Sequence, residues 1–317
     1  MTDIVAADDL FHHQGNDDPW WNESLCFSWC VPEEVINGFV YGWHRPNMGL
    51  SCGGPAVWDP SGEHTWDCLF YDWNWLQPLP PSAEATTFEL SNTFSVRSVD
   101  PLQRYEFGYD RDGCRVELTW WAAMAPHQVR IVGGMVPAGT CHYEQHGRMT
   151  GYVDLDGRRF EVDCWSMHDR TWGPRHIRNL PRGDYFWAVA DERTGFFAIA
   201  LDDGTIDRVI GGYLLRDGIL GDLVAGERRV VERGRDFRPI RIEVTAEDSL
   251  GRTLEAEGQC LNWLAWPGYP DLFEWWSLAE WQFDGLVGFG EEQDFFPPRT
   301  ARRLIRAGRT EPLELTL

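Results

Sequence analysis

Turn sequences recur along this chain between short strands, and many of them are built from Asp and Gly. They include Asp110-Arg111-Asp112-Gly113, Leu155-Asp156-Gly157, Arg216-Asp217-Gly218 and Asp284-Gly285. Asp-Gly pairs favour the positive φ angles of two-residue hairpin turns. The runs between them are rich in aromatic and β-branched residues, and no stretch sustains the helical period. The pattern therefore predicts an all-β chain of antiparallel hairpins.

The number of strands predicts two domains. About eight short strands precede residue 180 and about eight follow it, and 317 residues exceed a typical single domain. A barrel of about eight strands is just wide enough for one small ligand. We expect barrel-like domains at residues 1–180 and 181–317. Residues 1–34 look irregular, 64–73 reads as a strand, and only 299–307 reads as a helix.

The composition limits the partners of the protein. The chain contains 18 Trp, 17 Phe and 9 Tyr, and such aromatic surface suits an apolar ligand cavity as well as a packed β core. A formal net charge of −22 argues against nucleic acid, whose phosphates require a basic face, and against anionic membranes. All 28 basic residues are Arg, which excludes Lys-dependent chemistry. We expect a hydrophobic small-molecule partner, and a homodimer is compatible with the sequence.

Metal and disulfide chemistry have little support. The eight Cys form no Cys-x-x-Cys pair, so we expect reduced thiols in a cytoplasmic protein. The N-terminus is acidic rather than signal-like, and no run of 18 apolar residues predicts a membrane span. His142 and His146 come nearest to a ligand pair, but their spacing on a strand is unfavourable. We predict no metal and no cofactor.

The stretch Val162–Arg175 concentrates the titratable groups. It places His168, Asp169 and Arg170 between two indoles, Trp165 and Trp172, and the following Gly-Pro pair predicts the end of a strand. Burial would raise the pKa of an acid here, whereas an adjacent Arg would lower it. A plain salt-bridge cluster explains the composition equally well. The candidate acids are Asp169 and Asp184, and Asp72, Glu144 and Asp163 stand behind them.

The segment His168-Asp169-Arg170-Thr171-Trp172-Gly173-Pro174-Arg175 resembles the Arg-Asp-His-Ser-Trp-Gly-x-Arg signature of the carotenoid 1,2-hydratase (hydroxyneurosporene synthase) family. The segments 143–157 and 283–292 are similar to the flanking and closing motifs of that family. Asp169, Trp172, Gly173 and Arg175 match the signature, Thr171 replaces Ser, and His and Arg are exchanged at positions 168 and 170. The proton path therefore differs from that of the family if its His carries protons.

The resemblance implies two lipocalin-like domains with a ligand cavity near their junction. It also implies cofactor-free acid catalysis that adds or removes water at a C=C bond of a terpenoid, isoprenoid or steroid-like substrate through a tertiary carbocation. An isomerase or cyclase on the same substrates, and a non-catalytic carrier, remain alternatives. The expected catalytic residues are Asp169, Asp184 and His168. The expected substrate-binding residues are Trp172, Arg170, Tyr185, Trp187, Trp165, Trp73 and Trp75.

Overall fold

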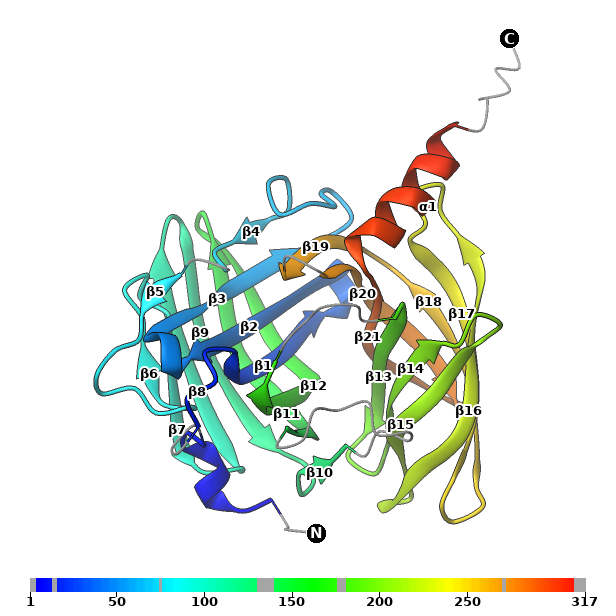
Figure 1. Cartoon of the computed structure of the whole chain (residues 1–317), viewed down its shortest axis with the longest axis horizontal. Coiled ribbons are helices and arrows are strands. Elements are labelled where there is room, and N and C mark those ends of the chain that lie inside the picture. Colours follow the sequence, from blue (N-terminus) through cyan, green and yellow to red (C-terminus); the bar gives the residue numbers. More distant parts are fainter. Residues whose placement is uncertain are drawn as a thin grey trace. The chain divides into compact units, whose positions relative to one another are not determined.

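The computed structural model describes residues 4–12, 16–73, 76–129, 140–175, 181–269 and 272–310 (Figure 1). The chain divides into two units. The first comprises Met1–His176 with Val189–Glu192, and the second comprises Ile177–Ala188 with Arg193–Leu317. Nearly all regular structure is β, so the predicted all-β class is confirmed.

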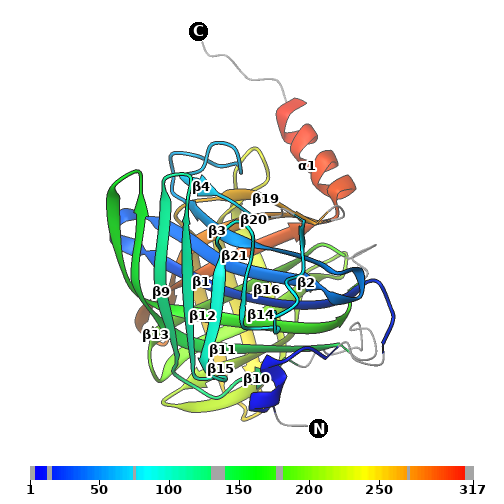
Figure 2. The same ribbon diagram turned by 90° about the vertical axis from the view of Figure 1, so that its left-hand side faces the viewer.

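The first unit is built on one sheet whose strands follow the order β4-β3-β2-β1-β12-β11-β9-β8-β7-β6, with β5 added to β3 and β10 to β11 (Figure 2). Three short 3-10 helices accompany it. The strands are β1 (Trp21–Val31), β2 (Ile36–Arg45), β3 (Leu50–Trp58), β4 (Phe70–Tyr71), β5 (Gln77–Pro78), β6 (Phe88–Glu89), β7 (Ser95–Asp100), β8 (Arg104–Arg111), β9 (Cys114–Ala122), β10 (His127–Gln128), β11 (Cys141–Leu155) and β12 (Arg158–Pro174), and the helices are η1 (Ala6–Asp9), η2 (Pro32–Glu34) and η3 (Pro46–Met48).

The second unit contains a closed barrel. Its strands follow the order β18-β17-β16-β15-β14-β13-β21-β20, and pairing of β18 with β20 closes the ring of eight; β19 is added to β20. The strands are β13 (Gly183–Asp191), β14 (Thr194–Asp202), β15 (Asp207–Arg216), β16 (Ile219–Arg233), β17 (Pro239–Asp248), β18 (Thr253–Cys260), β19 (Leu264–Tyr269), β20 (Leu272–Phe283) and β21 (Leu286–Phe296), followed by helix α1 (Pro298–Thr310). The two-domain lipocalin-like architecture is thus confirmed.

Asp-Gly turns connect the long hairpins as predicted. In the turns 112–113, 156–157, 217–218 and 284–285, the Asp has φ between 50° and 56° and the Gly between 73° and 85°. Both central residues of a type I′ turn need positive φ, and this turn matches the right-handed twist of the strands that it joins. Each turn fixes the register of its hairpin, and therefore decides which side chains lie on which face.

Several sequence-based expectations were wrong. Residues 1–34 are not irregular throughout, because β1 occupies the centre of the first sheet. The Ser, Cys and aromatic residues of β1 are buried on both faces of the strand. Such a strand lacks the alternation of buried apolar and exposed polar residues by which strands are recognised in a sequence. The segment 64–73 contributes only the two residues of β4. By contrast, the strand end predicted at Gly173-Pro174 is confirmed, because β12 ends at Pro174.

Other expectations hold. The helix predicted at 299–307 is α1, and all eight cysteines are free thiols. In the described part of the chain, every helix is too short or too polar to traverse a bilayer.

Candidate active site on the β11–β12 hairpin

Strand β12 carries two different sets of side chains, one on each face. Neighbouring residues of a strand point to opposite sides, so His168, Arg170 and Trp172 share one face while Asp169 and Thr171 share the other. We call the first the inner face, because His168 packs there against core aromatic rings. The structure therefore places Asp169 and Trp172, predicted together, on opposite faces of β12.

His168 is a core residue. Its ring stacks on Phe27 with centroids 4.0 Å apart and meets the edges of Tyr105, Trp120 and Tyr143 at 5.0 to 5.4 Å. Neither ring nitrogen has a hydrogen-bond partner among the described residues. Burial, aided by the charge of Arg170, holds the pKa of His168 well below that of an ordinary His. The imidazole is therefore neutral, which does not suit a proton carrier.

Arg170 belongs to a buried ion pair. Its Nη2 lies 2.7 Å from Oε2 of Glu23 on β1, and both side chains are fully buried. Burial acts to raise the pKa of Glu23, but Arg170 and hydrogen bonds from His12 and Trp21 outweigh it and hold the pKa at about 2. The ring of His12 also stacks on Trp172 at 4.0 Å. Arg170 and Trp172 thus anchor the N-terminal segment.

The opposite, outer face of β11 and β12 brings together His142, Glu144, Asp169 and Thr171. Register places Glu144 directly across from Asp169 and His142 across from Thr171. The Nε2 atom of His142 lies 2.8 Å from Oε1 of Glu144, and its Nδ1 lies 3.6 Å from Oδ1 of Asp169. Like charges directly opposite each other are destabilising, so these two carboxylates favour a cation between them.

Hydrogen-bond directions indicate that His142 is that cation. Thr171 Oγ1 donates its single hydrogen to Oδ1 of Asp169 at 3.2 Å, so the 2.7 Å contact between His142 Nδ1 and Thr171 Oγ1 needs a proton on Nδ1. Nε2 lies at ion-pair distance from Glu144 Oε1, which favours a proton on Nε2 as well. Burial acts to lower the pKa of His142, but Asp169 and Glu144 outweigh it and raise the pKa above the usual value.

The side chains of Glu144, His142 and Asp169 differ in their exposure to solvent. The side chain of Glu144 is 0% exposed, that of His142 15% and that of Asp169 25%. Glu144 therefore anchors the imidazolium from behind, while Asp169 offers a carboxyl group to a bound molecule. A proton can pass from His142 through Thr171 to Asp169.

The same cluster offers donor atoms for a metal. One ligand atom from each of His142, Glu144 and Asp169 lies within 4.8 Å of the others. Both ring nitrogens of His142, however, already face an oxygen atom at 2.7 or 2.8 Å. A metal would have to break one of these contacts, so proton transfer suits the arrangement better.

Asp184, the second predicted acid, lies in the other unit. It is fully buried, and its Oδ1 lies 2.7 Å from Nη1 of Arg228, which also approaches Asp207 and Glu292. Burial, opposed in part by Arg228, raises the pKa of Asp184 well above its usual value. Burial also acts to raise the pKa of Asp294, but three arginines outweigh burial and hold that pKa below its usual value. The side chain of Asp184 is within hydrogen-bond reach of Asp294. A neutral Asp184 that donates to Asp294 fits this network.

The remaining predicted residues make other contacts. Tyr185 packs on Phe197, on the face of β13 opposite to Asp184. Trp187 donates a hydrogen bond to Glu291. Trp165 is half-buried beside Arg148, and Trp73 packs on Tyr41. Trp75 lies outside the described residues.

Sequence reasoning named Asp169 but gave no role to His142 or Thr171, and kept Glu144 only in reserve. The Leu155-Asp156-Gly157 turn carried the signal that could have identified the partner of Asp169. Counting back from that two-residue turn pairs position 144 with 169. The pairing brings a carboxylate opposite a carboxylate, which is a reason to search the same face for a cation.

Solved structures that share this fold include the following three. A protein from Nitrosomonas europaea, provisionally named AttH, has 16% identity and a TM-score of 0.66, covering 92% of this chain and 98% of that one. Kievitone hydratase from Nectria haematococca has 13% identity and a TM-score of 0.55, covering 94% and 96%. CghA with Sch210972 has 11% identity and a TM-score of 0.56, covering 88% and 89%.

Sequence comparisons add a family. Among curated proteins, no sequence matches this chain significantly. One family model matches residues 5–292, which is most of the 317 residues. The chain therefore belongs to the family described as "Domain of unknown function (DUF7064)".

Proposed function

We propose that the protein is a cofactor-independent hydratase or dehydratase, and that Asp169 on the outer face of β12 exchanges the proton with the substrate. One observation carries the proposal: His142 lies between Glu144 and Asp169, with Thr171 bridging the imidazole and Asp169. This arrangement can supply and recover a proton without a metal or an organic cofactor.

Two further observations support the reaction class. The fold is shared with a protein named kievitone hydratase. The segment 168–175 resembles the carotenoid 1,2-hydratase signature, and Asp169 is the acid of that signature. The aromatic content and the net charge of −22 favour an apolar, uncharged substrate. We infer a terpenoid, isoprenoid or steroid-like molecule with a trisubstituted C=C bond.

In the hydration direction, Asp169 gains a proton from His142 through Thr171 and transfers it to the less substituted alkene carbon. A tertiary carbocation forms at the other carbon. The carboxylates of Asp169 and Glu144 then lie on the same face as this cation and stabilise it electrostatically. Water adds to the cation, and its surplus proton returns through Asp169 to His142. Dehydration of a tertiary alcohol follows the same steps in reverse.

This scheme changes the role first given to Trp172. Its indole lies on the inner face of β12 beside His12, so it does not share a face with Asp169. In this scheme the negative charge of the outer-face carboxylates stabilises the cation.

The test uses a panel of acyclic terpenoid alkenes, tertiary allylic alcohols and sterols, incubated with the protein in D₂O or H₂¹⁸O. Mass spectrometry should show uptake of one deuterium on carbon and one ¹⁸O per turnover. Asp169→Asn should lower the rate by about 10²–10⁴-fold, the usual contribution of a general acid. Asp163→Asn is the matched control, because this exposed carboxylate lies on the same strand and face and is 67% exposed beside Arg148.

The outcomes of this test distinguish a hydratase from an isomerase, a cyclase or a carrier. Deuterium on carbon without ¹⁸O would identify an isomerase or cyclase. Saturable binding of a terpenoid whose mass and connectivity never change would identify a carrier. Equal rates for wild type and Asp169→Asn would remove Asp169 from the mechanism.

A further inference from the structure

Helix α1 has one covered face and one exposed face. Ala301, Leu304 and Ile305 pack against a cluster that includes Trp275 and Phe296 of the second unit. Residues at these helical spacings form a single apolar stripe. The opposite side of the helix therefore points away from that cluster.

The exposed side of α1 carries an arginine stripe, which we define as Arg299, Arg302, Arg303 and Arg306. These positions follow the spacing i, i+3, i+4, i+7 of one helix face, and all four side chains are exposed. No Asp or Glu occurs in 298–310. Among the described residues, Arg299, Arg302 and Arg303 form no ion pair with a carboxylate, although the chain has 50 acidic residues.

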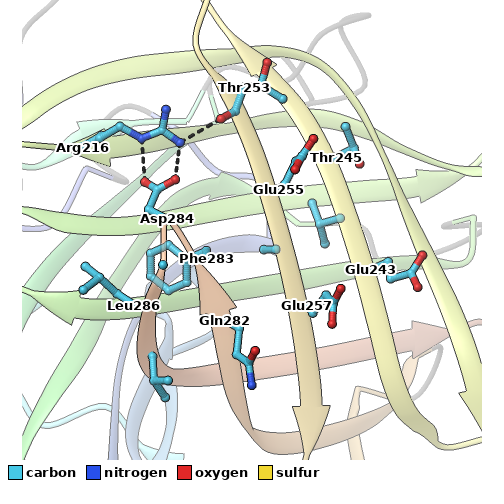
Figure 3. A pocket seen from close by; sticks show the side chains of 14 residues that line it. Arg216, Glu243, Thr245, Thr253, Glu255, Glu257, Gln282, Phe283, Asp284 and Leu286 are labelled. Atoms are coloured by element: carbon cyan, nitrogen blue, oxygen red, sulfur yellow. Dashed lines mark hydrogen bonds and ion pairs between the residues drawn. The ribbon is translucent and has the colours of Figure 1, made fainter.

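The same unit has an acidic concavity of about 850 Å³, formed by β17, β18 and the β20–β21 hairpin (Figure 3). Glu243, Glu255 and Glu257 line it. Leu286 and Val287 also line it. Glu243 pairs with Arg229, but Glu255 and Glu257 have no ion-pair partner in the described part of the chain. Leu286 and Val287 are 40% and 53% exposed.

The two surfaces match in charge and in spacing. Glu255 and Glu257 share a face of β18 and lie about 7 Å apart along the strand. Arg299 and Arg303 are separated by about 6 Å along the helix axis. Exposed apolar side chains that line the concavity suit the alkyl stems of arginine.

Helix α1 of one copy does not reach the acidic concavity of the same copy. The helix packs beside Trp275 near the start of β20, whereas the concavity begins at Gln282 near its end. Seven residues of strand separate them by roughly 23 Å. A second copy has no such constraint.

We propose that the arginine stripe of one copy docks into the acidic concavity of a second copy, and that two reciprocal contacts close a dimer. A reciprocal pair of contacts is self-complementary and leaves no open end. Each copy carries a net charge of −22, but at about 0.15 M salt the repulsion is screened beyond roughly 8 Å, and the contacting ion pairs are closer than that. The proposal is independent of the reaction at Asp169.

The test is sedimentation velocity of the full chain over a concentration series, with folding of each variant checked by circular dichroism. Wild type should dimerise, and Arg299→Glu/Arg303→Glu or Glu255→Arg/Glu257→Arg should each raise the dimer dissociation constant by about tenfold or more. An equimolar mixture of the two variants should restore a dimer, since each acidic helix then meets a basic concavity. Arg111→Glu/Arg115→Glu, at the exposed β8–β9 turn, is the control and should leave the dimer intact.

Three results would overturn the proposal. A wild-type protein that stays monomeric throughout the series would do so, as would a dimer that persists unchanged in both charge-reversal variants. A monomer that binds phosphatidylserine vesicles through Arg299 and Arg303 would assign the arginine stripe to an anionic membrane surface instead.

Discussion

Replacing Glu292 by Gln should make the protein more stable than wild type at neutral pH. Glu292 lies on β21, is fully buried and accepts a hydrogen bond from Arg228. Burial raises its pKa from 4.5 to about 7, against the opposing charge of Arg228, and the neighbouring Asp294 adds to the rise. The folded protein therefore holds a proton on Glu292 more tightly than the unfolded chain does.

The magnitude follows from linkage. A group whose pKa is raised on folding contributes stability that is complete below its unfolded pKa and is lost as pH rises through its folded pKa. For Glu292 the loss falls between pH 4.5 and about 7. It amounts to about 3 kcal/mol at 1.36 kcal/mol per pH unit. Gln resembles the protonated acid at every pH, so the Glu292→Gln variant avoids this loss.

The assay is urea denaturation of wild type and variant between pH 4 and pH 8. The difference in unfolding free energy should grow by about 3 kcal/mol across this range, in favour of Glu292→Gln. The matched control is Glu247→Gln on β17, where the side chain is exposed and the difference should stay constant. A difference between Glu292→Gln and wild type that does not change with pH would refute the reasoning.

Two other substitutions test the assignment of the β12 faces. His168→Phe keeps the stack on Phe27 and removes two buried nitrogens without partners, so the unfolding free energy should rise by about 1–3 kcal/mol while the hydration rate is unchanged. A large loss of rate would restore His168 as a proton carrier. His142 should give an alkaline limb in the pH–rate profile, because its imidazolium is lost as pH rises through its raised pKa. In His142→Gln that limb should disappear along with most of the rate, and an unaltered profile would exclude the relay.

Local rules of turn geometry made most of the fold predictable. Asp156-Gly157 and Asp284-Gly285 need little context to adopt positive φ, and the strands on either side follow from the turns. Strand β1 could not be predicted in this way. Its Asn22 and Glu23 are fully buried, and polar residues are expected inside only when tertiary partners such as Arg170 are known.

The candidate site was predictable only in part. Asp169 stands in a recognisable motif, but its partners His142 and Glu144 come from another strand more than twenty residues away, and their meeting depends on register. Asp184 was named as a second acid, but its buried network with Arg228 and Asp294 depends on strands that sequence reasoning could not bring together.

The alternation of β12 has a consequence for divergence within a family. Even-numbered positions such as His168 and Arg170 contribute to the packing of the first unit, while odd-numbered positions such as Asp169 and Thr171 carry the proposed chemistry. Substitution at odd positions can alter the reaction without opening the core, and substitution at even positions can adjust stability without touching the substrate. Insertion or deletion of one residue in the 156–157 turn would shift the register of β12 by one position and exchange the two sets of side chains. The turn should therefore tolerate replacement of its residues far better than a change in their number.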